Sequence, residues 1–146
     1  MNPAIFYHPD AYSTTMEKVM GRNVAGETFL RAFLRHARNE VFWSQAFEDV
    51  HGREFERLVR GAGRTEPVRS ASGQAIAGLR EAGVVHYPDP VLTRPAWQRS
   101  HFGDDAWSMT GITHTTTSHD AMDAIVGLMT APVQPWDALI CTSTAA

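Results

Sequence analysis

Short apolar runs alternate along this chain with longer segments in which apolar residues recur every three or four positions. A short apolar run between turn residues is typical of a buried strand, and the three-to-four-residue recurrence is typical of an amphipathic helix. The clearest helical segment follows Gly26. Its apolar face is expected to consist of Phe29, Leu30, Phe33, Leu34 and Ala37.

The same pattern predicts the other elements. Strands are expected at residues 4–7, 41–43, 84–87, 107–113 and 138–142, with a very short one at Val68. Helices are expected at residues 53–62, 74–82 and 119–130, the last capped by Ser118. Residues 91–105 show only a weak pattern, which predicts a long functional or lid-like loop.

Strands that alternate with helices predict an α/β fold, because parallel strands are joined by helical crossovers. The fold class is therefore a Rossmann-like, doubly wound, mainly parallel sheet with helices on both faces. The chain stops soon after the strand predicted at 138–142, at Ser143–Thr144, a polar turn of the kind that opens a helix. The sheet is accordingly expected to be incomplete at the C-terminus.

Composition narrows the class of protein further. The 146 residues suffice for one domain over residues 1–146, and 43% apolar with 20% charged residues is typical of a soluble globular protein. A net charge of −3 gives no electrostatic reason to expect a nucleic-acid partner. The sequence shows no secretory signal and no transmembrane segment, so a cytoplasmic location is expected. Cys141, the single cysteine, is expected to be a small core residue.

The first candidate site is the segment Gly21–Gly26, which includes Arg22 and Asn23. It is expected to be a glycine-bearing loop that runs into a helix, where backbone N–H groups and the helix dipole favour an anion such as a phosphate. The spacing matches neither a dinucleotide fingerprint nor a P-loop. The alternative is a glycine-bearing turn that lets the helix pack closely on the sheet.

The second candidate site surrounds His114, which directly follows a predicted strand and is flanked by Thr113 and Thr115. In doubly wound sheets ligands bind at the carboxyl ends of the strands. Hydroxyl groups around an imidazole suit hydrogen bonding to a polyhydroxylated ligand, although a structural histidine in a polar turn would give the same pattern. His8 follows the first predicted strand and is expected at the rim of the same site.

A metal site is not expected. His119 and Asp123 share one helix face, but no third ligand is spaced near them, and acidic residues are common in the first turn of a helix. A solvated helix start accounts for both residues.

Three segments in order, Gly21–Phe33, Gly111–Thr116 and Ala131–Ser143, resemble the N-terminal domain of bacterial glycosyltransferases of family four. Such enzymes have the GT-B architecture, in which two Rossmann-like domains face each other across a cleft. The resemblance implies transfer of a sugar from a nucleotide-diphosphate sugar to a hydroxyl acceptor, with retention and without an essential metal or another cofactor. The similarity covers nearly the whole chain.

The resemblance also implies roles for particular residues. The N-terminal domain holds the acceptor, its glycine loop (Gly21, Arg22, Asn23 and Gly26) approaches the donor diphosphate, and His114 faces the reacting sugar without a covalent role. The second domain, which binds the nucleotide and carries the family's paired glutamates, has no counterpart in this sequence. Three interpretations stay open: a truncated acceptor-side half of a hexosyltransferase, inactive alone; a non-catalytic module that binds a sugar or phosphate; and an interaction subunit completed by a partner chain.

Overall fold

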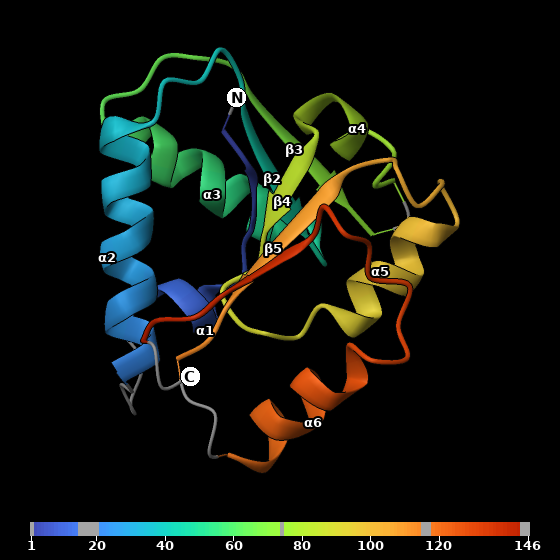
Figure 1. The fold of residues 1–146 in the computed structure, drawn as a ribbon. Coiled ribbons are helices and arrows are strands. Elements are labelled where there is room, and N and C mark those ends of the chain that lie inside the picture. Colours follow the sequence, from blue (N-terminus) through green and yellow to red (C-terminus); the bar gives the residue numbers. More distant parts are fainter. Residues whose placement is uncertain (1, 15–20, 74, 115–117, 144–146) are drawn as a thin grey trace.

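The protein is an all-parallel six-stranded sheet covered by helices (Figure 1), seen in a computed structural model that describes residues 2–14, 21–73, 75–114 and 118–143. The strand order is β3-β2-β1-β4-β5-β6. From β1 the chain moves outward through β2 and β3, then crosses back to place β4 on the other side of β1. The strands are β1 (Ala4–Phe6), β2 (Phe42–Ala46), β3 (Val68–Ser72), β4 (Val84–His86), β5 (Ser108–Ile112) and β6 (Ala138–Ile140).

Helices lie on both faces of this sheet, so the predicted doubly wound α/β class is confirmed. One face carries α1 (Pro9–Tyr12), α2 (Gly21–His36) and α3 (Asp49–Gly61). The other carries α4 (Leu79–Ala82) and α5 (Thr93–Ser100), with α6 (His119–Gly127) beyond them in Figure 1. No helix in the described ranges has both the length and the apolar character needed to cross a membrane.

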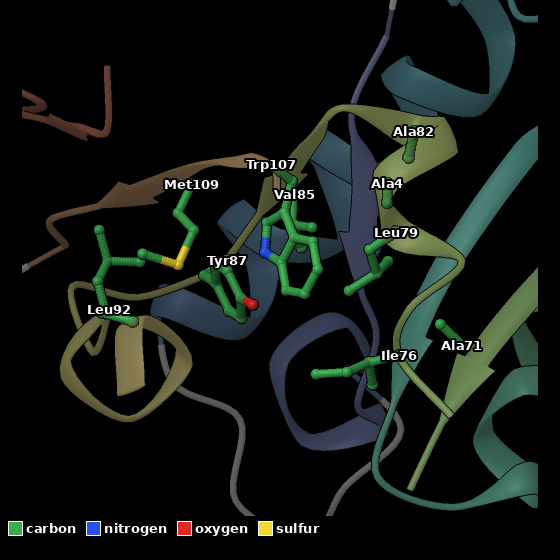
Figure 2. Close-up of a cluster of buried hydrophobic side chains, with 11 residues drawn as sticks. Ala4, Ala71, Ile76, Leu79, Ala82, Val85, Tyr87, Leu92, Trp107 and Met109 are labelled. Carbon is green, nitrogen blue, oxygen red and sulfur yellow. The ribbon is translucent and has the colours of Figure 1, made fainter. Parts of the chain in front are cut away.

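The side chains of β1 point alternately to the two faces of the sheet, so this strand contributes to the hydrophobic cluster on each face. Ala4 faces one cluster of buried side chains, while Ile5 faces the other, since successive residues of a strand point to opposite faces. The first cluster, shown in Figure 2, gathers Val85, Trp107 and Met109 beneath α4 and α5. The second packs the α2 residues Leu30 and Leu34 with residues of α3 and β2.

The segment at 91–105 is not the predicted loop, because α5 occupies its centre. Arg99 on α5 is fully buried and forms a bidentate ion pair with the fully buried Asp137, at 2.6 and 2.8 Å. Arg99 also donates to the carbonyls of Trp107 and Pro132, and Asp137 accepts the backbone N–H of Met109. This cluster ties α5 and β5 to the segment that leads into β6.

The C-terminal strand and the last helix are more exposed than the sequence suggests. The strand predicted as buried at 138–142 is β6, and Cys141 beyond it is exposed rather than a core residue. The helix predicted at 119–130 was expected to bury Met122, Ile125, Val126 and Met129. Met122 and Val126 on α6 and Met129 just beyond it are exposed, the last at 87%, whereas Ile125 is half-buried. The Ser118 cap is confirmed, since its hydroxyl accepts the N–H of Ala121.

Candidate functional site

The site lies where the strand order reverses, between β1 and β4. The chain leaves these neighbouring parallel strands in opposite directions across the sheet, and this opens a crevice at their carboxyl ends. A cavity of about 280 Å³ occupies this position. Its wall is made by side chains at or just after the ends of β1, β2, β4 and β5, together with one from α2: Phe6, His8, Asp10, Ala11, Arg22, Phe47, Pro88, Asp89 and His114.

His114 enters this cavity from the end of β5, at the position expected from the sequence. Its Nε2 lies 2.9 Å from the carbonyl oxygen of Pro88. A carbonyl oxygen only accepts, so Nε2 carries the proton and donates it. In the neutral ring Nδ1 is then left as an acceptor for a ligand hydroxyl.

His8 enters from the end of β1, also as expected. It caps α1, because its Nδ1 accepts the backbone N–H of Asp10 at 3.2 Å. This bond places the proton of the neutral ring on Nε2, which is therefore a donor. His8 and His114 thus bring one donor and one acceptor nitrogen to the same cavity.

The predicted glycine loop is wrong as a loop, because Gly21–Gly26 are helical residues of α2. Asn23 is 2% exposed, and its amide donates to the carbonyl of Asp10 at 2.5 Å. Gly26 packs directly against the backbone of Ala11. These two residues join α2 to α1, so the alternative of a turn that packs the helix on the sheet is wrong as well, since the close contact is made by helical residues with another helix. Gly26 also lines the smaller cavity beside His114.

Arg22 is the member of this segment that lines the cavity. Its side chain is exposed, and no ion pair to it occurs among the described residues. The guanidinium is therefore available to an anion or a hydroxyl group of a ligand.

The two threonines beside His114 differ in what the structure shows. Thr113 is 2% exposed, and its N–H donates to the carbonyl of Ile140 at 2.9 Å. It joins β5 to β6 and is not part of the cavity wall. Thr115 lies outside the described residues, so its predicted contact with a ligand stays a prediction.

Asp89 is a site residue that the sequence analysis missed. In the sequence, Pro88–Pro90 indicates only the end of the strand predicted at 84–87, yet the carboxylate of Asp89 lines the crevice. Oδ1 accepts the N–H of Val91 at 2.9 Å, which fixes the carboxylate in place and leaves Oδ2 for a ligand. An acidic residue directly after the strand that follows a crossover was the signal available in the sequence.

Tyr12 is a second residue that was missed. It lines a smaller cavity of about 130 Å³, which shares Pro88 and His114 with the main one. The hydroxyl of Tyr12 is buried and has no hydrogen-bond partner among the described residues. Burial, with a smaller contribution from the charge of Asp89, raises the pKa of Tyr12, so the hydroxyl keeps its proton.

Electrostatics keep the nearby imidazole of His86 neutral. Burial lowers the pKa of His86, and proximity to His114 lowers it further, since two positive charges would repel each other. Its Nδ1 lies 2.9 Å from the hydroxyl of Thr110. Across the described ranges, no group of three His, Cys, Asp or Glu side chains is placed to hold a metal ion. His119 and Asp123 form an exposed ion pair at 3.2 Å.

The arrangement combines apolar walls with a few polar groups of both hydrogen-bonding senses, which is the usual make-up of a small-molecule site. Sugar hydroxyls both donate and accept, so they match such a mixture. The scan against protein-family models, the search of curated proteins and the search of solved structures each returned no match for this chain.

Proposed function

We propose that this chain is the acceptor-side half of a glycosyltransferase and binds a polyhydroxylated acceptor in the crevice between β1 and β4. The observation that carries the proposal is the convergence of His8, Asp89 and His114, from three different strand ends, in one cavity with Phe6 and Phe47. Imidazole and carboxylate groups bind hydroxyls, while flat aromatic walls accept the C–H faces of a sugar ring. The Rossmann-like fold agrees with this function but does not select it.

In this proposal the residues have separate roles. Asp89 Oδ2 and His8 Nε2 orient the acceptor, and His114 hydrogen-bonds the sugar bound in the crevice and, during transfer, the donor sugar near its reacting carbon. Arg22 stabilises the negative charge of the leaving diphosphate. The acceptor oxygen bonds the anomeric carbon as the bond from that carbon to the diphosphate breaks, and the hydroxyl proton passes to the departing diphosphate. A second domain or partner chain is required to bind the nucleotide.

The test is a calorimetric titration of the chain with UDP, UDP-glucose, GDP-mannose, methyl α-D-glucopyranoside and methyl α-D-mannopyranoside. We expect saturable binding of at least one sugar that is weakened about tenfold or more by His114→Ala, since a lost hydrogen bond in a ligand site costs about 1 kcal/mol or more. His119→Ala, an exposed histidine on α6, is the matched control and should bind like the parent. The proposal is refuted if no sugar binds, or if His114→Ala and His119→Ala bind the sugar equally well.

The second candidate is a subunit that acts through protein contacts. The observation in its favour is the exposed apolar surface at α6, made by Met122 and Val126 on the helix and Met129 in the turn that follows it. A second copy covering this face would make a dimer in sedimentation-velocity experiments, and Val126→Glu would abolish it. A monomer at all accessible concentrations would exclude this form of the candidate.

A further inference from the structure

A second cavity of about 230 Å³ adjoins the one that holds His114. The two share Phe6, Phe47 and Asp89 as a common wall. Cavities that bind drug-sized molecules usually measure about 300–1,000 Å³. Neither cavity reaches that range alone, whereas together they do. The site is therefore better suited to a ligand that spans both compartments than to one that fills either.

The floor of the second compartment is aromatic. Phe6 stacks on Tyr87 with ring centroids 5.2 Å apart and an interplanar angle of 29°. Phe47 meets the same Phe6 ring edge-on at 5.1 Å. These contacts fix three rings relative to one another and form a rigid apolar surface for the C–H groups of a flat ring.

Gln45 gives this compartment a buried polar group that is not fully used within the protein. The residue is 5% exposed, and its Oε1 accepts the hydroxyl of Tyr87 at 2.6 Å. Within the described residues its amide nitrogen has no partner, although the side chain lines the cavity. The amide nitrogen is not among the buried atoms that lack a partner, so its N–H groups are accessible and can donate to a ligand acceptor placed in the cavity.

Arg94 and Gln98 complete the polar edge, both from α5. The guanidinium of Arg94 lies over the ring of Phe47 at 5.4 Å, and no ion pair to it occurs among the described residues. Guanidinium, amide and carboxylate groups are planar, and each offers two hydrogen-bonding atoms side by side. The spacing between the two hydrogen-bonding atoms of such a group matches the spacing between neighbouring hydroxyl groups on a sugar ring.

We propose that the compartment lined by Gln45, Arg94 and Gln98 is a second saccharide subsite, so that the ligand of this protein carries at least two sugar rings. The inference rests on the proposed function and names its substrate class. The charges of Asp89 and Arg94 offset each other in this compartment, so its lining has no net positive charge to select a phosphate, and its hydrogen-bonding groups fit an uncharged sugar.

The experiment is a titration followed by ¹⁵N–¹H correlation spectra of the whole chain, in which Gln side-chain amides and the Arg Nε–H are directly visible. The probes are methyl α-D-glucopyranoside and methyl α-D-mannopyranoside against maltose, isomaltose and α-1,6-mannobiose. At least one disaccharide should bind about tenfold tighter than the matching methyl glycoside, as expected for one or two additional hydrogen bonds. That disaccharide alone should shift the side-chain signals of Gln45 and Gln98.

Variants separate the two compartments. Arg94→Ala and Gln98→Ala should remove the advantage of the disaccharide and leave binding of the methyl glycoside unchanged, because neither residue lines the His114 cavity. Arg53→Ala, an exposed arginine on α3, is the control and should change neither.

The outcomes distinguish this inference from the function on which it rests. If methyl glycosides bind in a His114-dependent way and no disaccharide binds tighter, the second subsite is refuted and the proposed function stands. The subsite is also refuted if a disaccharide still binds more tightly than the matching methyl glycoside in both Arg94→Ala and Gln98→Ala. If no sugar in the panel binds, the proposed function fails and the subsite fails with it.

Discussion

Replacing Gly26 with alanine tests whether this glycine serves helix packing or ligand approach. A Cβ at Gly26 would overlap the carbonyl oxygen of Ala11 and lie 3.2 Å from its carbonyl carbon and 3.4 Å from Cδ1 of Tyr12. The oxygen belongs to the backbone of α1, so no side-chain rotation relieves the overlap. Helix α2 must instead move away from α1.

The size of the effect follows from two opposing contributions. Alanine in a helix is more favourable than glycine by up to about 1 kcal/mol. Overpacking of a close contact costs about 1–3 kcal/mol, and here the movement also strains the bond from Asn23 to the carbonyl of Asp10. We therefore expect Gly26→Ala to lower the free energy of unfolding by about 1–2 kcal/mol.

Gly21→Ala is the matched control, because it lies in the same helix and a Cβ there meets nothing within 4 Å. It should leave stability unchanged or raise it by a few tenths of a kcal/mol. The measurement is equilibrium urea unfolding followed by far-ultraviolet circular dichroism. Equal or greater stability of Gly26→Ala would refute the packing argument. A loss of ligand binding without loss of stability would instead favour a direct role for Gly26 at the ligand.

Three further predictions concern stability. Tyr12→Phe should keep or slightly raise thermal stability, because it removes a buried hydroxyl with no partner among the described residues; a loss above about 1 kcal/mol in urea unfolding would contradict this. Asp137→Ala should lower the free energy of unfolding by about 3–5 kcal/mol, because Arg99 would stay buried without its counter-ion. A decrease below about 1 kcal/mol would show that the pair is not buried in solution. Burial holds the pKa of His86 in the folded chain below its unfolded value of 6.5. As the pH falls, the unfolded chain therefore binds a proton before the folded chain does, and the free energy of unfolding should decrease below about pH 6.5. Urea midpoints between pH 7.5 and 5 measure this slope, which should be shallower in His86→Gln.

The sheet was predictable because most of its strands contain a short apolar run bounded by turn residues; β3, which is largely polar, was expected only as a very short strand at Val68. Helix α5 was not predictable, because Pro95 lies in the first turn of the helix and Arg99 lies on its buried side. A proline at the start of a helix is tolerated, but in a pattern analysis it resembles a break. An arginine counts as exposed unless its partner is known, and Asp137 lies 38 positions away in the chain. Sequence periodicity contains no information on such a pair.

The candidate site was partly predictable for a geometric reason. His8 and His114 each follow a strand, and parallel strands bring such positions to one edge, as the cavity confirms. The glycine segment misled because glycine permits a loop but does not require one. Inside α2, Gly26 is explained by its contact with Ala11, which no local pattern reveals.

Helix α6 shows why an amphipathic pattern identifies a face without saying what covers it. The pattern placed Met122, Ile125, Val126 and Met129 on one side, yet Met122 and Val126 on α6 and Met129 beyond its end are exposed, and Ile125 is only half-buried. The helix packs through small residues instead: Ala121 and Ala124 are buried, and a Cβ on Gly127 would lie 2.8 Å from the hydroxyl oxygen of Thr93 on α5. The close approach of Gly127 to Thr93 joins the end of α6 to α5, and the buried side of α6 consists of small residues. The larger apolar side chains are thereby left on the surface, and this arrangement gives the interaction-subunit candidate its structural basis.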